Sequence, residues 1–278
     1  MSINFNKSKL QEAYESILGG ETEKRKNDYK NKFENHLLSN EDIERLKIPS
    51  YSDANDYFYN ACICMFEAIY GVCDRRYSWA TVKLYYSIFY ALRSSLLCKG
   101  YALVRYGKYI YRLKLQEGEE PLYNKKKCAN SHMATLYHYK EVFMESDVLG
   151  DNTIDDKDAY GWMEDVRNIV NYKSVNFMEP DHLEVWDEVD EALYNDSLLK
   201  LIENICNDDT YLYCFQPEYA VIAIPLVRIL KTSDDIKSNN EISSFSWKQN
   251  RIKYLNGIVA KREELKYLKS ILFSDTVF

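Results

Sequence analysis

The run Trp79–Tyr101, WATVKLYYSIFYALRSSLLCKGY, is the feature that most limits what this chain can fold into. Large apolar side chains recur in it at spacings of three and four, the period of an amphipathic helix; they are Trp79, Val82, Tyr86, Phe89 and Leu97. Gly100 follows the last apolar pair, where helices commonly end in a left-handed turn. The run therefore predicts one buried helix around which the rest of the chain is organised.

One charged residue falls on this apolar stripe. Arg93 shares the stripe with Phe89 and Leu97. Because an unpaired buried charge is costly, this arginine needs a partner or polar surroundings. The pattern leaves two interpretations open: a structural arginine that forms an ion pair or extends past the edge of the core, or an arginine that lines a polar cleft.

The composition favours a mainly helical protein. Only 9 glycines and 5 prolines interrupt the 278 residues, whereas 25 tyrosines can pack and still need hydrogen-bond partners. Further helices are expected at 53–73, 132–149, 159–175, 182–206 and 245–273, with a short helix that ends near Pro49 and a cap at Ser52 or Asp53. Residues 219–230 contain Pro225 and predict a kinked buried helix more than a pair of strands.

The period changes from helical to alternating in residues 101–115, YALVRYGKYIYRLKL. The alternation is centred on Gly107-Lys108, and glycine at the first turn position suits a type II′ hairpin. A continued helix is the competing interpretation. The sequence therefore favours a small β-hairpin inserted in an all-α chain.

Charge is unevenly distributed. The net charge of −7 does not indicate a general nucleic-acid-binding protein, yet residues 93–127 hold nine basic and three acidic side chains. Basic residues interleaved with tyrosines suit phosphate contacts and base stacking. The candidate contact residues for RNA or for a partner protein are Arg93, Arg105, Lys108, Arg112 and Lys114. An acidic protein partner, or an exposed hairpin without a specific role, fits this segment equally well.

Several chemistries lack a motif in this sequence. There is no glycine-rich phosphate loop and no Ser-His-Asp pattern. Cys128, His132 and His138 lack the fourth ligand of a structural zinc site, so we expect no metal and no cofactor. The seven cysteines form no paired motif, and no apolar run is long enough to cross a membrane. These patterns are typical of a cytoplasmic protein with reduced thiols.

One polar cluster could carry chemistry. Arg167 and Asn171 are four residues apart, so a regular helix would place both on one face, next to the apolar stripe. An arginine there could hold a phosphate through two hydrogen bonds, with Asn168 or Asn171 orienting it and Tyr172 donating to it. The alternative is an arginine paired with Glu164 or Asp165.

Three segments resemble HEPN-type proteins. The run YYSIFYALRSSLLCKGY is similar to the aromatic helix of that family, whose pattern is close to YYAMFHAARALLxxKG. SHMATLYHYKEVFMESDVL is similar to its histidine-led segment, and MEDVRNIVNYKS falls where the family has its arginine motif. The resemblance covers residues 52–195 and implies an antiparallel helical bundle at 51–195 with a basic insertion at 101–127. Residues 1–50 and 196–278 would then be helical extensions.

The resemblance also implies a function. Many HEPN-type proteins are metal-independent ribonucleases of toxin–antitoxin and antiphage systems, often dimeric, with a motif of Arg, often Asn, and then His. Arg167 and Asn168 match this motif, but Tyr172 occupies the histidine position. A phenol with a pKa of about 10 is a poor acid or base near neutrality. The implied alternatives are an RNA-engaging protein, with metal-independent ribonuclease activity as its catalytic form, and a non-catalytic scaffold that dimerises and binds a partner protein from the same operon.

Overall fold

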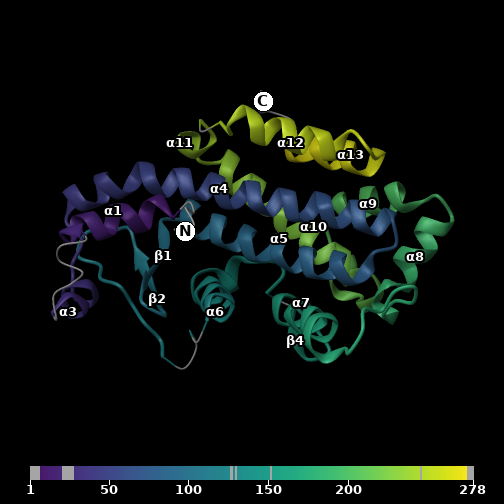
Figure 1. Cartoon of the computed structure of the whole chain (residues 1–278), viewed down its shortest axis with the longest axis horizontal. Coiled ribbons are helices and arrows are strands. Elements are labelled where there is room, and N and C mark those ends of the chain that lie inside the picture. The colour runs from purple at the N-terminus through teal and green to yellow at the C-terminus, as the bar shows by residue number, and fades with distance from the viewer. Residues whose placement is uncertain are drawn as a thin grey trace, which may run out of the picture. The chain divides into compact units, whose positions relative to one another are not determined.

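The computed structural model describes residues 7–20, 28–125, 128, 130–150, 152–244 and 246–273. The chain is mostly helical, with a small antiparallel hairpin (Figure 1). The helices are α1 Lys9–Ile17, α3 Tyr29–Glu34, α4 Asn40–Cys73, α5 Tyr77–Cys98, α6 Ser131–Phe143, α7 Ala159–Asn168, α8 Asp187–Tyr194, α9 Leu198–Cys206, α10 Pro217–Lys237, α11 Asn240–Ser243, α12 Gln249–Val259 and α13 Glu263–Leu272. The strands are β1 Tyr101–Tyr106, β2 Tyr109–Lys114, β3 Thr153–Ile154 and β4 Lys157–Asp158.

The chain divides into two compact units. Unit 1 comprises Met1–Tyr57, Leu92–Val142 and Asp235–Phe245, and unit 2 comprises Phe58–Ala91, Phe143–Asp234 and Ser246–Phe278. Helices α4, α5 and α10 each contribute residues to both units. The expected division into 1–50, 51–195 and 196–278 stays a prediction.

Helices α4 and α5 form a neighbouring antiparallel pair (Figure 1). In unit 1 the Ser94 hydroxyl donates to the Ala54 carbonyl over 2.8 Å. In unit 2 Lys83 of α5 forms an ion pair with Glu67 of α4. The aromatic run is therefore a helix, as predicted. However, Trp79 does not join its buried stripe, because that side chain is 52 % exposed.

The predicted helix boundary near residue 50 is wrong. Helix α4 runs without a break through Pro49, and Asp53 lies well inside it. Asp53 is nevertheless a cap, for a different helix. Its carboxylate accepts hydrogen bonds from the Ser8 hydroxyl and from the backbone N–H groups of Lys9 and Leu10 at 2.5–3.0 Å. These are N–H groups that the first turn of α1 cannot satisfy internally.

The hairpin prediction is confirmed. Strands β1 and β2 pair antiparallel, and the register places Tyr106 opposite Tyr109, which leaves Gly107 and Lys108 as the two turn residues. Gly107 has a φ of 56°, which a glycine adopts at little cost in a primed turn. One hairpin face is buried through Ala102, Val104, Tyr111 and Leu113. The basic side chains of Arg105, Arg112 and Lys114 lie on the other face.

Two other predicted helices are each divided. The expected helix 182–206 becomes a 3₁₀ turn, α8 and α9, with a break at Asn195–Ser197 where Asp196 has a φ of 53°. The expected helix 245–273 becomes α12 and α13, separated at 260–262. The helical spacing of apolar residues continues across both breaks, because the helix after each break still buries one face in the core of unit 2. Spacing alone therefore does not locate such turns.

The 219–230 segment is a helix, as predicted. It forms the middle of α10 and is almost completely buried from Ala220 to Ile229. Arg228 is the charged exception, 3 % exposed. Its guanidinium lies 3.6 Å from the Asp147 carboxylate, which also accepts a hydrogen bond from the Tyr160 hydroxyl and one from the Leu149 N–H. Unit 2 therefore contains a buried ion pair with additional hydrogen bonds.

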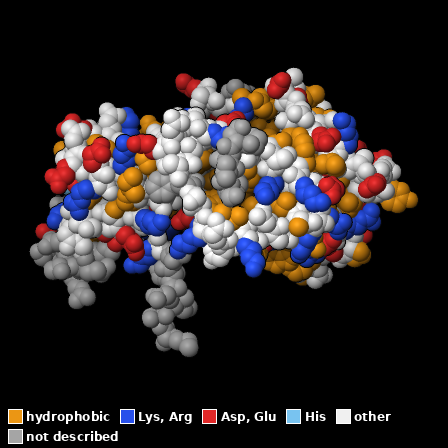
Figure 2. Space-filling model, turned by 90° about the horizontal axis from the view of Figure 1, so that it is seen from above, with side chains coloured by type: hydrophobic (Ala, Val, Ile, Leu, Met, Phe, Trp, Pro, Cys, Tyr) orange, Lys and Arg blue, Asp and Glu red, His pale blue; other side chains and the backbone are white. Residues whose placement is uncertain are grey.

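Within the described part of the chain, no helix has the length and apolarity needed to cross a membrane. No disulfide joins any of the seven cysteines, all of which the structure describes. On the face seen in Figure 2, basic side chains are interspersed with acidic ones.

Candidate functional site

Arg167 lies in the last turn of α7, in unit 2. Helix α7 begins at an Asp158 cap, whose carboxylate accepts from the Gly161 N–H over 3.1 Å. After Asn168 the backbone widens into a π turn, Ile169–Lys173. Such turns occur frequently at functional sites. The predicted arginine motif therefore coincides with the irregular end of a helix.

The Arg167 side chain is held by aromatic rings. Its guanidinium carbon lies 4.3 Å from the centroid of the Tyr85 ring and 5.6 Å from that of Tyr172. Burial raises the pKa of Tyr85 to about 12, although Arg167 acts in the opposite direction. Because the neutral phenol is retained at physiological pH, Tyr85 offers Arg167 a ring face and a hydroxyl but no negative charge.

No carboxylate among the described residues forms an ion pair with Arg167, although the residue is only 5 % exposed. Asp165, one of the two expected partners, pairs with Lys157 instead. The Nε atom of Arg167 is buried and has no hydrogen-bond partner in the described part of the chain. A buried cation that forms no ion pair is costly unless an anion arrives to neutralise it. This arrangement suits an external anionic ligand.

The neighbouring motif residues differ in exposure. Tyr172 is 70 % exposed while its ring stays within cation–π distance of Arg167. Asn168 is half-buried, and Asn171 is exposed. The π turn ends the four-residue periodicity, so the shared face expected for Arg167 and Asn171 does not follow from helical spacing. Tyr172 is instead the motif residue that contacts the arginine.

Sequence reasoning did not identify Tyr85 as part of this site. Tyr85 belongs to α5 and lies on the buried side of that helix, 1 % exposed. The helical periodicity places the neighbouring tyrosine, Tyr86, on the apolar stripe and leaves Tyr85 off it. The only signal was the doubled tyrosine at 85–86, which a helix must direct to two different sides.

The predicted basic contact residues lie in unit 1 and are not equivalent. Arg105 and Lys108 are exposed, although an Arg105 nitrogen donates to the Ser131 hydroxyl over 2.6 Å. Arg112 is half-buried over the Tyr101 ring at 5.8 Å. Lys114 pairs with Glu119 at 3.6 Å. Arg105 and Lys108 are therefore the members of this set that are best placed to meet a ligand.

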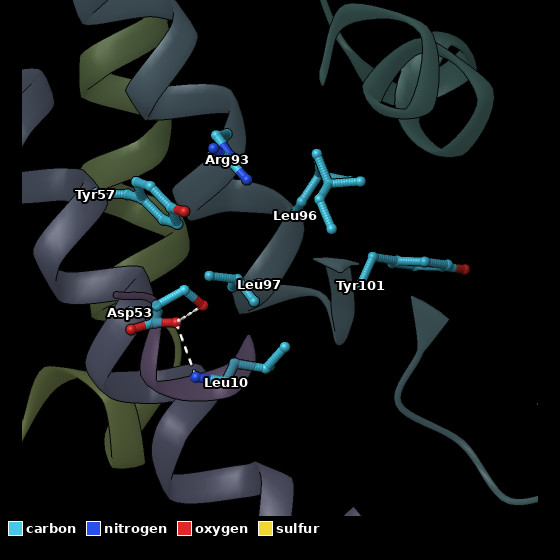
Figure 3. Close-up of a pocket in the computed structure, with 9 residues that line it drawn as sticks. Leu10, Asp53, Tyr57, Arg93, Leu96, Leu97 and Tyr101 are labelled. Atoms are coloured by element: carbon cyan, nitrogen blue, oxygen red, sulfur yellow. Dashed lines mark hydrogen bonds between the residues drawn. The ribbon is translucent and has the colours of Figure 1, made fainter. Parts of the chain in front are cut away.

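Arg93 lines a small cavity of about 10 Å³ in unit 1, together with Asp53 and Tyr57 (Figure 3). Its guanidinium carbon lies 4.6 Å from the centroid of the Tyr57 ring. A volume of this size holds about one water molecule. Arg93 thus lines a polar cavity, as one of the two interpretations expected, but the cavity is too small for a nucleotide.

Cys128 and His138 do come together, with Sγ 3.3 Å from Nε2. Both side chains are almost completely buried, at 1 % and 3 % exposure. No group of three or more candidate metal ligands forms among the described residues. Burial, together with the positive charge of Arg112, lowers the pKa of His138 to about 4. This pair therefore belongs to the interior of unit 1.

The lowered pKa of His138 predicts a loss of stability in acid. An unfolded histidine has a pKa of about 6.5, so between pH 6.5 and 4 the unfolded chain binds a proton that the folded chain does not. The free energy of unfolding should therefore fall by about 3 kcal/mol across this window. Urea denaturation at several pH values measures this change in the free energy of unfolding. His138→Phe should remove this part of the pH dependence, whereas His182→Phe should retain it; equal slopes in the two variants would contradict the assignment.

No protein-family model, curated protein or solved structure matches this chain. The class that the fold defines is a mostly helical protein with a small antiparallel hairpin, β1–β2, and a second, shorter strand pair, β3–β4. Its function has to be inferred from its own side chains, and Arg167 is the strongest starting point.

Proposed function

We propose that this chain is a HEPN-like protein of a bacterial antiphage defence or toxin–antitoxin system, and that it engages RNA through Arg167. The observation that carries the proposal is an arginine, Arg167, that is 5 % exposed, has its guanidinium within cation–π distance of two tyrosine rings and forms no ion pair with a described carboxylate. A phosphate can accept two hydrogen bonds from such a group. Its placement at the end of a helix beside a π turn also agrees with a functional role.

If the protein cleaves RNA, Arg167 stabilises the negative charge that develops on the scissile phosphate. Asn168 and Asn171 are the candidates to orient that phosphate. Tyr172 is exposed and close enough to Arg167 to donate a hydrogen bond to the same group. A phenol transfers protons poorly near neutral pH, so this site would be a slow ribonuclease. The side chains named here would act without a metal ion.

A second candidate is a non-catalytic HEPN-like scaffold. The tyrosine at position 172, where the resembled family has histidine, favours this alternative. Exposed apolar side chains follow it in sequence: Val175 is 98 % exposed and Phe177 is 60 % exposed. Such side chains suit a homodimer interface or a partner protein from the same operon. In this case Arg167 would bind RNA, or a partner's acidic group, without cleavage.

One experiment separates the two candidates. Purified protein is incubated with labelled single-stranded RNA, with a chelator present, and both binding and cleavage are measured. Binding with cleavage supports the ribonuclease, and binding without cleavage supports an RNA-binding scaffold. If the protein fails to bind RNA at low salt, the proposal of RNA engagement is wrong. Sedimentation of the same sample shows whether the protein forms dimers.

The exposed hairpin cations provide a further prediction. Arg105→Glu combined with Lys108→Glu should weaken RNA binding and make it less dependent on salt, because fewer phosphate charges are neutralised. Both residues are exposed, so the fold should survive. The matched control is Arg45→Glu, which changes an exposed arginine of the same unit. RNA titrations at several salt concentrations measure the effect; identical salt slopes in wild type and double variant would exclude the hairpin from the interface.

A further inference from the structure

Unit 2 contains an open cavity of about 340 Å³ that the function proposed above does not use. It lies between the end of α4 and the start of α5, and its lining includes Glu67, Tyr70, Gly71, Arg76, Trp79 and Lys83. Cavities of 300–1,000 Å³ are typical of small-ligand sites.

The cavity has two aromatic side chains in its lining. Tyr70 is half-buried, and Trp79 is 52 % exposed although it is the largest side chain of the predicted buried stripe. The Trp79 ring also contacts Phe177, with ring centroids 5.5 Å apart. Exposed aromatic rings at the edge of a cavity are suited to stacking against a planar ligand.

The same cavity is rich in cations. Arg76 of the lining lies 5.6 Å from the centroid of the Tyr70 ring, and two cations outside the lining, Lys261 and Arg262, lie 5.0 Å and 5.9 Å from it. Among the described residues, only Asp74 forms an ion pair with any of the three. An excess of positive charge therefore remains beside the aromatic rings. This combination favours a ligand with both a planar ring and a negative charge.

The cavity also carries one fixed acceptor. The Glu67 carboxylate is held by the Lys83 ammonium and by the Tyr254 hydroxyl, which donates to it over 2.9 Å. A carboxylate fixed in this way can accept a hydrogen bond from the N–H groups of a nucleobase. Stacking rings, nearby cations and a fixed acceptor together match the parts of a nucleotide.

We infer that this cavity takes an unpaired base of single-stranded RNA, with the adjoining phosphate held by the cations around Tyr70. The inference rests on the proposed engagement of RNA and adds a base-binding subsite to it. The chain itself connects the two sites: Tyr172 contacts Arg167, and Phe177, five residues later, contacts Trp79. A strand bound at Arg167 could therefore place a neighbouring base against Trp79.

Two variants test this subsite, each with a matched control in unit 2. Trp79→Leu removes the stacking ring, and Tyr194→Leu removes an aromatic ring that is 80 % exposed elsewhere in the unit. Arg76→Glu reverses a cavity cation, and Lys200→Glu reverses a lysine whose side chain is 71 % exposed. The probe is a labelled six-nucleotide RNA followed by fluorescence anisotropy, and thermal melts show that each variant is folded.

We expect Trp79→Leu and Arg76→Glu each to weaken RNA binding about tenfold or more, in line with the loss of one stacked base. The controls should stay within about twofold of the wild type. Binding of RNA should also quench the emission of Trp79, because the other three tryptophans are at most 7 % exposed.

The outcomes distinguish a failure of the base-binding subsite from a failure of the proposed RNA engagement through Arg167. If wild-type protein binds no RNA, both are wrong. If wild-type protein binds RNA and Trp79→Leu behaves like Tyr194→Leu, the base subsite is wrong and RNA engagement stands. If Trp79→Leu abolishes function in cells but leaves RNA affinity unchanged, the surface serves a protein partner and the subsite is likewise overturned.

Discussion

Replacing Arg167 with alanine should lower RNA cleavage about 10²–10³-fold while leaving the protein folded, because one charge-stabilising donor is removed. The residue has no described carboxylate partner, so its removal leaves no buried acid unpaired. Stability should fall by only about 1–2 kcal/mol, from the lost contacts with the Tyr85 and Tyr172 rings. A ribonuclease assay and a thermal melt on the same sample measure both effects.

Three further variants define what Arg167 does. Arg167→Lys keeps the charge but not the two-pronged geometry, so it should recover only part of the activity. Tyr172→Phe keeps the ring over the arginine and should cost less than Arg167→Ala. Tyr172→His restores the residue found in the resembled family and should raise cleavage. A folded Arg167→Ala protein with unchanged RNA binding and unchanged cellular function would remove Arg167 from the proposed site.

The largest loss of stability is expected from Asp147→Ala. This carboxylate is buried beside Arg228 and accepts hydrogen bonds from the Tyr160 hydroxyl and the Leu149 N–H. Its removal leaves the Arg228 cation buried without that acid, which typically costs about 3–5 kcal/mol. The thermal midpoint should fall by about 10 °C.

Two comparisons show whether burial is the cause. Asp165→Ala breaks a more exposed ion pair with Lys157 and should cost at most about 1 kcal/mol. The double change Asp147→Leu with Arg228→Met replaces the buried pair with apolar side chains and should recover much of the lost stability. Equal losses in the free energy of unfolding for Asp147→Ala and Asp165→Ala would mean that the buried ion pair stabilises the protein no more than the exposed one.

The helical character of this chain could be predicted from the sequence because it depends on local spacing. The apolar stripe of α5 and the alternation around Gly107 are each visible within about twenty residues. Asp53 shows where such reasoning stops. Its position before an apolar-periodic run suggests a cap for the helix that begins there. Its hydrogen-bond partners instead lie at Ser8–Leu10, more than forty positions away. Only tertiary structure brings that acceptor to the start of α1.

The candidate site was predictable in part for the same reason. Arg167 and Tyr172 belong to one short motif, so their proximity followed from the sequence. Tyr85 comes from another helix, and the π turn depends on how the end of α7 packs, so neither followed from spacing. Trp79 was assigned to the core because its position fits the stripe, whereas the structure leaves it half exposed beside the cavity. Partly exposed aromatic residues are difficult to tell from core residues by periodicity alone.

The alternation of the two units along the chain has a consequence for how the protein can be divided. The chain passes between the units inside α4, α5 and α10 and again at the last residue of α6, where the backbone is helical and offers a protease no loop. Neither unit can be released as one continuous fragment, because each unit is assembled from three separate stretches of the chain. Loss of α4, α5 or α10 should therefore disrupt both units at once, whereas a point substitution can alter one unit alone.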